Sequence, residues 1–152
     1  MKVLQILPQL NIGGVERGTL DLSRALINRG HKSFVISGGG VLVDELKRTG
    51  AEHIELPIHH KSFRTLSLAN ELSETISNID PNIVHVRSRL PAWVNYRAFK
   101  KLKKKPLLIS TFHGLYSFPI YSKVMSFVDH SIAISNTVES YILENYKLEK
   151  KD

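Results

Sequence analysis

The chain of 152 residues has the size of one ordinary domain, and with 42% hydrophobic and 23% charged residues it can bury a core. No apolar stretch reaches the roughly 20 residues of a membrane-spanning helix, and proline and polar residues interrupt the N-terminus too early for a secretory signal, which predicts a cytoplasmic protein. The absence of cysteine excludes disulfides, thiolate metal sites and a cysteine nucleophile. The formal net charge of +7 favours anionic partners.

Short apolar runs alternate with amphipathic stretches along the whole chain. The predicted strands, in chain order, are 3–7, 33–37, 51–56, 83–86, 107–112 and 131–134. The predicted helices are 15–28, 41–48, 66–77, 91–102, 120–127 and one that starts after an N-cap at Ser135 or Asn136 and runs to 146. Gly30 and Gly50 are expected to end the first two helices. The six-residue tail KLEKKD is expected to be frayed.

The apolar spacing within the helices predicts their buried faces. We expect the sheet to be covered by Leu20, Leu22, Leu26 and Ile27, by Leu68, Leu72 and Ile76, and by Trp93, Tyr96, Phe99 and Leu102. This alternation predicts an α/β fold with a doubly wound parallel, Rossmann-like sheet of about six strands. Such sheets bind ligands beyond the carboxyl ends of their strands, which places the site in loops 8–14, 38–40, 87–90 and 113–119.

Gly13 and Gly14 lie in the first strand-to-helix turn. Backbone amides and a helix N-terminus meet at such a turn, and together they can bind a phosphate without a metal or a side chain. The alternative is a plain tight turn. The pair alone does not identify the molecule that carries the phosphate.

Several nucleotide and metal sites are disfavoured by missing motifs. The first turn lacks G-x-G-x-x-G and the second strand ends in Ser37-Gly38 without an acidic residue, which argues against a nicotinamide cofactor. No P-loop occurs, no histidine pair has helical H-x-x-x-H spacing, and no D-x-D is present, so we expect no metal and no cofactor. His59 and His60 are expected to point to opposite sides of an extended loop.

Two further segments place polar residues at the expected ligand edge. His113 ends the fifth strand within TFHG, where it is either a functional or a satisfied structural histidine. Arg87, Ser88 and Arg89 follow the fourth strand and precede a helix, so they could hold an anionic group. The alternative is that both arginines are surface charges.

A lysine cluster occupies the far end of the same helix. Its members are Lys100, Lys101, Lys103, Lys104 and Lys105. The simpler interpretation of this cluster is a solvated helix end. The more specific interpretation is attraction of the lysines to an anionic membrane surface. Nucleic-acid binding is disfavoured because no aromatic residues are interleaved with the lysines.

The segment LPQLNIGGVERGTLDLSRALINRGH resembles the opening of the family 4 retaining glycosyltransferases, which have the GT-B fold. The likeness continues in chain order through VISGGG, DPNIVHVRSRLPAW, STFHG and AISNTVESYI. The combination of HVRSRLPAW with TFHG is most similar to the bacterial branch of lipopolysaccharide core assembly.

The resemblance implies transfer of a sugar, with retained anomeric configuration, from a nucleotide-diphosphate sugar to a hydroxyl of a glycan or glycolipid. It implies that this chain is the acceptor-side half of the enzyme. Gly13 and Gly14 would then contact the donor diphosphate, His113 would lie at the reaction centre as the catalytic residue, and Arg87, Ser88 and Arg89 would bind an acceptor. The protein would then be located in the cytoplasm, and it could also attach peripherally to the inner face of the membrane.

The sequence departs from the family pattern in one respect. The second half of such enzymes carries the nucleotide pocket with a glutamate pair spaced E-x7-E, and no such pair occurs here. We therefore expect residues 1–146 to form a Rossmann-like N-terminal domain, 147–152 to form the charged tail, and the donor-binding domain to be absent. The chain would be inactive alone, as a fragment, a relic or one subunit of a split enzyme. The alternative is a non-catalytic module that docks at an anionic membrane surface.

Overall fold

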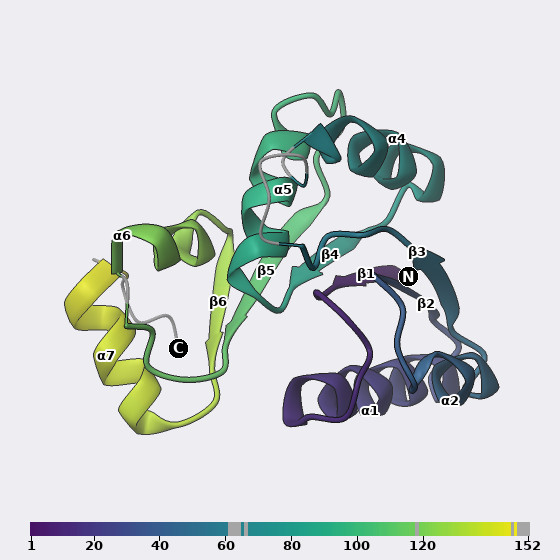
Figure 1. Ribbon diagram of the computed structural model, residues 1–152, viewed down its shortest axis with the longest axis horizontal. Helices are drawn as coiled ribbons and strands as arrows, with labels where there is room; N and C mark the ends of the chain where they lie inside the picture. Colours follow the sequence, from purple (N-terminus) through teal and green to yellow (C-terminus); the bar gives the residue numbers. More distant parts are fainter. Residues whose placement is uncertain (61–64, 66, 118, 147, 149–152) are drawn as a thin grey trace.

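The computed structural model describes residues 1–60, 65, 67–117, 119–146 and 148. At its centre lies a sheet of six strands in the order β3-β2-β1-β4-β5-β6, with every neighbouring pair parallel (Figure 1). The strands are β1 (Lys2–Ile6), β2 (Lys32–Ser37), β3 (Glu52–Glu55), β4 (Ile83–Val86), β5 (Leu107–Phe112) and β6 (His130–Ala133). The chain starts in the middle and winds outward twice, so the predicted doubly wound, Rossmann-like α/β fold is confirmed.

The helices cover both faces of this sheet. They are α1 (Gly14–Asn28), α2 (Val43–Arg48), α4 (Ala69–Ile79), α5 (Arg89–Phe99), α6 (Pro119–Ser122) and α7 (Asn136–Tyr146), with a 3-10 turn η1 (Lys123–Ser126). Helices α1 and α2 lie on one face, and α4 and α5 lie on the other (Figure 1). This follows from right-handed crossovers, because the chain moves in opposite directions across the sheet in its two halves.

The core has two parts because both faces of the sheet are covered. In β1, Leu4 and Ile6 are fully buried on the side of α4 and α5, where the larger cluster also contains Val86 and Phe112. The smaller cluster lies under α1 and α2 and includes Leu20. Burial on both faces explains why the strands read as continuous apolar runs.

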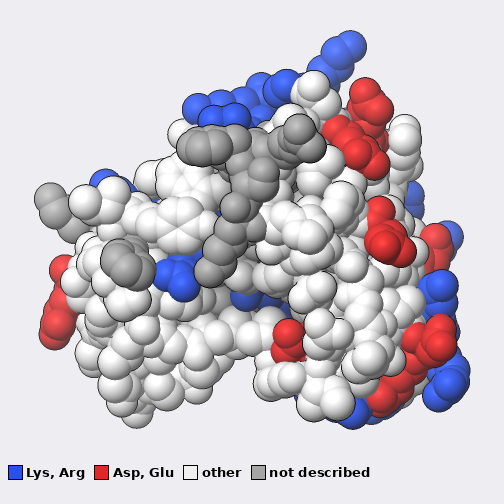
Figure 2. Space-filling model, viewed as in Figure 1, with Lys and Arg blue, Asp and Glu red and all other residues white. Residues whose placement is uncertain are grey.

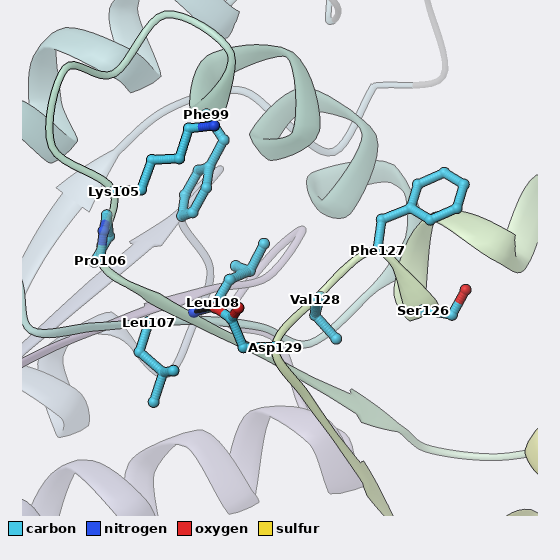
Figure 3. A pocket seen from close by; sticks show the side chains of 9 residues that line it. All are labelled: Phe99, Lys105, Pro106, Leu107, Leu108, Ser126, Phe127, Val128 and Asp129. Carbon is cyan, nitrogen blue, oxygen red and sulfur yellow. Dashed lines mark hydrogen bonds between the residues drawn. The ribbon is translucent and has the colours of Figure 1, made fainter. Parts of the chain in front are cut away.

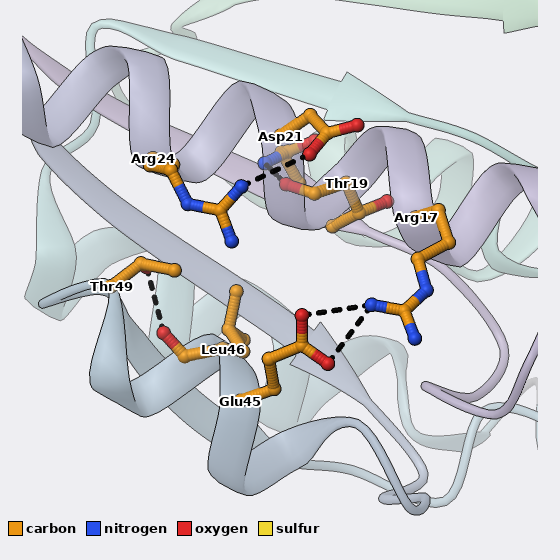
Figure 4. Close-up of polar contacts among 8 residues, drawn as sticks. Arg17, Thr19, Asp21, Arg24, Glu45, Leu46 and Thr49 are labelled. Atoms are coloured by element: carbon orange, nitrogen blue, oxygen red, sulfur yellow. Dashed lines mark hydrogen bonds and ion pairs between the residues drawn. The ribbon is translucent and has the colours of Figure 1, made fainter.

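An exposed ion pair connects the two helices above the smaller cluster. Arg17 Nη1 of α1 donates to both carboxylate oxygens of Glu45 of α2, at 2.8 and 2.9 Å (Figure 4). Further along α1, Arg24 pairs with Asp21 at 3.3 Å (Figure 4). Exposed pairs of this kind add little stability, so the apolar cluster beneath them holds α2 in place.

The predicted helix ends are partly confirmed. Gly30 and Gly50 have φ angles of +75° and +90° just after their helices, as expected of glycine stops. The Val138 N–H donates to Ser135 Oγ at 3.3 Å, which makes Ser135 the N-cap of α7. The predicted helix over 120–127 is instead divided into α6 and the 3-10 turn.

The predicted buried faces need two corrections. The predicted buried face of α5 and the residues after it is confirmed only in part. Phe99 and Leu102 are buried, whereas Trp93 and Tyr96 lie at the margin of the core. Spacing by three drifts around a helix of 3.6 residues per turn, so other residues fill the inner face; they are Ala92, Val94, Asn95 and Ala98.

On α1, Leu20 is buried as expected, but Leu22, Leu26 and Ile27 are only half-buried. The other fully buried residues of this helix are polar, namely Thr19 and Ser23. They face a polar residue of β1, which is described below.

Some predicted features fall partly outside the described residues: position 66 of the predicted helix 66–77 with the preceding positions 61–64, position 118 of the predicted site loop 113–119, and positions 147 and 149–152 of the tail. The prediction for His59 and His60 is wrong, because the chain turns there and the two ring centroids lie 3.9 Å apart. Among the described helices, none combines the length and apolarity needed to cross a membrane.

Candidate functional site

The carboxyl ends of β1 and β4 form the centre of the candidate site. From these adjacent strands the chain departs toward opposite faces of the sheet, which leaves a crevice between the following loops. The molecular surface is indented between the part formed by α1 and α2 and the part formed by α6 and α7 (Figure 2). The fold therefore brings the loops after β1, β2, β4 and β5 to one edge, as predicted.

The loop after β1 is fixed to the loop after β2 by backbone hydrogen bonds. The Leu10 N–H donates to the Gly39 carbonyl at 2.7 Å, and the Leu42 N–H donates to the Leu10 carbonyl at 2.9 Å. Gly40 has φ +138°, and a Cβ on this residue would overlap the Leu10 carbonyl. Only glycine allows this close approach, so Gly40 helps to set the path of the loop that leads to α1.

Gly13 and Gly14 form the N-terminus of α1. Gly13 is the N-cap, and no side chain caps the helix. Gly14 is exposed, with no atom within 4 Å of the place where a Cβ would lie. The carboxylate of Glu16 occupies the space that a Cβ on Gly13 would fill. Gly14 is thus open to solvent at the helix N-terminus, while the carboxylate of Glu16 lies beside Gly13. The diphosphate role of both glycines stays a prediction.

Arg87 lies inside the protein, with 7% of its surface exposed. Its Nη1 donates to Gln5 Oε1 at 3.0 Å. Its Nη2 would be 3.0 Å from a Cβ on Gly18 of α1, so the guanidinium packs against a helix turn that has no side chain there. Burial lowers the pKa of Arg87, and the carboxylate of Glu16 opposes this shift.

Gln5 connects this buried charge to helix α1. Its Nε2 donates to the Thr19 carbonyl at 3.2 Å and to Ser23 Oγ at 3.0 Å. The sequence reasoning missed Gln5, although a polar residue in the middle of the apolar run VLQIL was an available signal. The side chain joins β1, β4 and α1, which are the elements that shape the crevice.

Two histidines lie near the same guanidinium. His85 is 6% exposed, and its Nε2 lies 2.7 Å from Thr111 Oγ1. Burial lowers the pKa of His85 to about 3, with further contributions from Arg87 and His113. Burial, and then the charge of Arg87, lower the pKa of His113 to about 4. Both imidazoles are neutral at pH 7.

His113 directly follows β5 and reaches the ligand edge, as predicted. It is partly exposed, while its Nε2 is buried and has no hydrogen-bond partner among the described residues. A neutral imidazole has one ring nitrogen that donates and one that accepts a hydrogen bond, and Nε2 is closed to a ligand in this structure. Its functional role stays a prediction.

Ser88 and Arg89 begin helix α5. Ser88 is the N-cap, in extended conformation, and makes no side-chain capping bond. Arg89 is partly buried and stacks against Tyr116 and Tyr121. The structure therefore separates the three predicted acceptor residues: Arg87 points into the interior, and Ser88 and Arg89 are open to the crevice side of the chain.

The lysine cluster lies at the opposite end of α5, as predicted, and all five side chains are exposed; they form the blue area at the upper edge of Figure 2. Lys104 pairs with Asp80 at 2.8 Å, and Lys101 contacts Asn70. Lys100 lies over the ring of Tyr96, 4.4 Å from its centroid. The cluster is remote from the carboxyl edge of the sheet.

A hollow of about 580 Å³ lies near this cluster. It lies beside the amino end of β5, between Lys105, Leu107 and Phe127 (Figure 3). Its carboxylate, Asp129, already accepts a hydrogen bond from the Leu108 N–H at 2.8 Å. The hollow is open and lined by both polar and apolar groups, and parallel sheets do not place their ligands at this edge.

The sequence profile of Glycosyltransferase Family 4 matches residues 12–152. A search of curated proteins gives no match. Among solved structures, a glycosyltransferase from Rickettsia africae ESF-5 is 36% identical, with a TM-score of 0.81 over 97% of this chain and 40% of that chain. The chain therefore belongs to glycosyltransferase family 4.

Two more distant structures share the fold. The lipopolysaccharide outer core galactosyltransferase WaaB is 16% identical, with a TM-score of 0.71 over 95% of this chain and 42% of that one. Sucrose-phosphate synthase from Thermosynechococcus elongatus is 15% identical, with a TM-score of 0.76 over 99% of this chain and 47% of that one. The chain thus spans less than half the length of each of these three proteins.

The buried contact of Arg87 generates the first testable prediction. Gln5→Leu leaves the guanidinium in the interior without this acceptor, and we expect a loss of about 3 kcal/mol in the free energy of unfolding, measured by urea titration. Gln5→Leu combined with Arg87→Met removes the charge as well and should recover part of the loss. Additive effects of the two substitutions would contradict the coupling.

The second prediction concerns pH. His85 is neutral in the folded chain until its pKa of about 3, whereas the unfolded chain takes up a proton near pH 6.5. Stability should be constant above that pH and fall as the pH drops below it, with His85 contributing about 2–3 kcal/mol by pH 4.5. In urea titrations at several pH values, His85→Gln should reduce the fall, and substitution of the exposed His130 is the matched control. A fall of equal size in His85→Gln would refute the assignment.

Proposed function

We propose that this chain is the acceptor-side half of a retaining glycosyltransferase. It would act with a donor-binding half to transfer a sugar from a nucleotide-diphosphate sugar to a lipopolysaccharide-core or other glycan or glycolipid acceptor. The observation that carries the proposal is the meeting of Gly13, Gly14, Arg89 and His113 at one carboxyl edge of a family 4 chain. The lipopolysaccharide acceptor draws support from the likeness to WaaB.

The residues at this edge suit the chemistry. Departure of a nucleoside diphosphate creates negative charge, which oriented amides and nearby cations stabilise. The N-terminus of α1 at Gly13 and Gly14, which no side chain caps, and the buried positive charge of Arg87 beside α1 supply such an environment, and we propose that no metal is needed. His113 is neutral, so it can position the transferred sugar by a hydrogen bond without placing a second charge beside Arg87.

The length of the relatives supports a missing half. This chain spans 40% of the Rickettsia africae glycosyltransferase, so the remainder of that protein has no counterpart here. We propose that the donor half is supplied by further polypeptide or by a separate chain, and that the present residues do not transfer sugar alone. The reaction would take place in the cytoplasm, where nucleotide sugars are made.

A chimera tests this proposal. The chain is fused to the segment of the Rickettsia africae protein that it does not cover, and sugar transfer from labelled nucleotide sugars to core oligosaccharides is measured. We expect activity in the chimera, a loss of at least about a hundredfold in His113→Ala, and no loss in His130→Ala, which alters an exposed histidine at the far edge.

The anomeric configuration of the product, measured by NMR, reports on retention. Absence of transfer with every donor and acceptor tried, or equal rates in His113→Ala and the unsubstituted chimera, would remove the proposal.

A specific observation also favours a second function, docking at an anionic membrane surface. Of the five exposed lysines, only Lys104 forms an ion pair with a described carboxylate. Each free lysine near an anionic leaflet contributes about 1 kcal/mol of attraction, which would suffice for weak peripheral attachment.

Flotation with vesicles tests this docking. The chain should bind vesicles that contain anionic phosphatidylserine more strongly than neutral ones, and binding should weaken with salt. Glutamine at all five lysine positions should abolish it, while substitution of the exposed Lys32 and Lys47 should have a small effect. Binding that persists after neutralisation of the cluster would exclude this surface.

A further inference from the structure

The two arginines after β4 differ in what they leave available to a ligand. Arg87 is buried and bonded to Gln5, so its guanidinium is committed to the interior. Arg89 is only partly buried, and among the described residues its guanidinium makes one hydrogen bond, to Ser122 Oγ at 3.3 Å. No described carboxylate forms an ion pair with Arg89. A guanidinium has five N–H donors, so most of those of Arg89 are not used by the described residues.

Arg89 lies between two aromatic rings. Its guanidinium carbon is 4.7 Å from the ring centroid of Tyr116 and 5.5 Å from that of Tyr121. Stacking of this kind holds the planar cation in a fixed orientation while its edge stays free for bidentate binding of an anion. The guanidinium of Arg89 is therefore held in position by its ring contacts, whereas the lysine side chains at the other end of α5 are exposed.

The aromatic residues around Arg89 are themselves held in place. The Tyr141 hydroxyl of α7 donates to the Tyr116 carbonyl at 2.5 Å. The Trp93 indole N–H of α5 donates to the Tyr121 carbonyl at 2.9 Å, and the two rings are 6.3 Å apart. Two different helices thus support the two tyrosines, so the arrangement is a preorganised one.

The surroundings combine a cation with exposed aromatic and apolar surface. Tyr121 is 41% exposed, and the residues beside the two tyrosines, Leu115 and Ile120, are 59% and 90% exposed. Tyrosine rings pack against the apolar C–H faces of sugars and offer a hydroxyl at their edge. Burial raises the pKa of both tyrosines, which keeps these hydroxyls protonated as donors.

We propose that Arg89, Tyr116 and Tyr121 form the acceptor subsite and that it accepts a sugar unit bearing an anionic group, a phosphate or a carboxylate. The guanidinium edge binds the anion, and the tyrosines pack against the sugar ring. This inference rests on the proposed function, since it places the acceptor on the same carboxyl edge as His113. It assigns binding to Arg89 and leaves Arg87 to support the site from within.

Binding to the full chain tests the subsite with defined probes. Isothermal titration compares glucose 6-phosphate and glucuronate with glucose and with inorganic phosphate. We expect at least one anionic sugar to bind about tenfold more tightly than either glucose or phosphate, and to weaken with salt. Equal affinity for glucose and both anionic sugars, tighter binding of free phosphate, or no binding of any probe would overturn the proposal.

Variants locate the binding. Arg89→Gln should weaken binding of the anionic sugar about tenfold, and Arg89→Lys should restore only part of it, because lysine keeps the charge but not the planar fork. Arg97→Gln is the matched control, since Arg97 is an exposed arginine near the other end of the same helix. An equal loss in Arg97→Gln, or full binding in Arg89→Gln, would refute the subsite.

The chimera separates this inference from the function on which it rests. If His113→Ala abolishes transfer while Arg89→Gln transfers at an unchanged KM to phosphorylated and unphosphorylated acceptors alike, the subsite is wrong and the function stands. A raised KM for the phosphorylated acceptor alone is the result that we expect. Loss of transfer in every chimera would instead count against the proposed function.

Discussion

The buried guanidinium of Arg87 is the constraint on which the geometry of the crevice depends. A charge at 7% exposure is costly unless it is hydrogen-bonded, and Gln5 provides the acceptor. Arg87 Nε is buried without a partner among the described residues, so this bond of Nη1 is its one described side-chain hydrogen bond. The same Gln5 amide bonds to α1, so the contact also ties the arginine to the helix whose N-terminus carries Gly13. The absence of a side chain at Gly18 makes room for the guanidinium. One interior charge thus sets the relation between β1, β4 and α1.

This charge also determines the electrostatics of the edge. Burial, and then this charge, lower the pKa values of His85 and His113, so that the imidazole at the ligand edge, His113, and the buried one behind it are both neutral beside a fixed positive charge. The carboxylate of Glu16 lies close enough to oppose the burial shift of Arg87. An edge arranged in this way attracts anions without offering a second ionised base, which fits substrates that carry phosphates.

The sequence predicts the layers of this fold well because burial on both faces of a parallel sheet produces apolar runs that are easily recognised. The four inner strands and the order of the helices follow from those runs, whereas the edge strands β3 and β6 are at most half-buried and follow from their place in the alternation. Gly30, Gly50 and Ser135 mark element ends by local conformational preference alone. Gly13, Gly14 and His113 could be placed at the ligand edge by the same reasoning, although their roles could not.

What the sequence could not predict depends on contacts between distant elements. Arg87 and Arg89 are two positions apart, and the sequence alone does not distinguish their environments. In the structure Arg87 is buried, whereas Arg89 lies against Tyr121. Their difference arises from Gln5, which is 82 positions away from Arg87. The stacking of His59 on His60 was missed because a turn replaced the expected extended segment.

We propose that the carboxyl edge around Gly13 and Gly14 binds the anionic part of the substrate. Amide chemical shifts of the labelled chain, followed during titration with inorganic pyrophosphate, report on this site residue by residue. We expect saturable shifts of the Gly13 and Gly14 amides, with little change at the lysine cluster. Shifts confined to residues 100–105, with none at the N-terminus of α1, would contradict it.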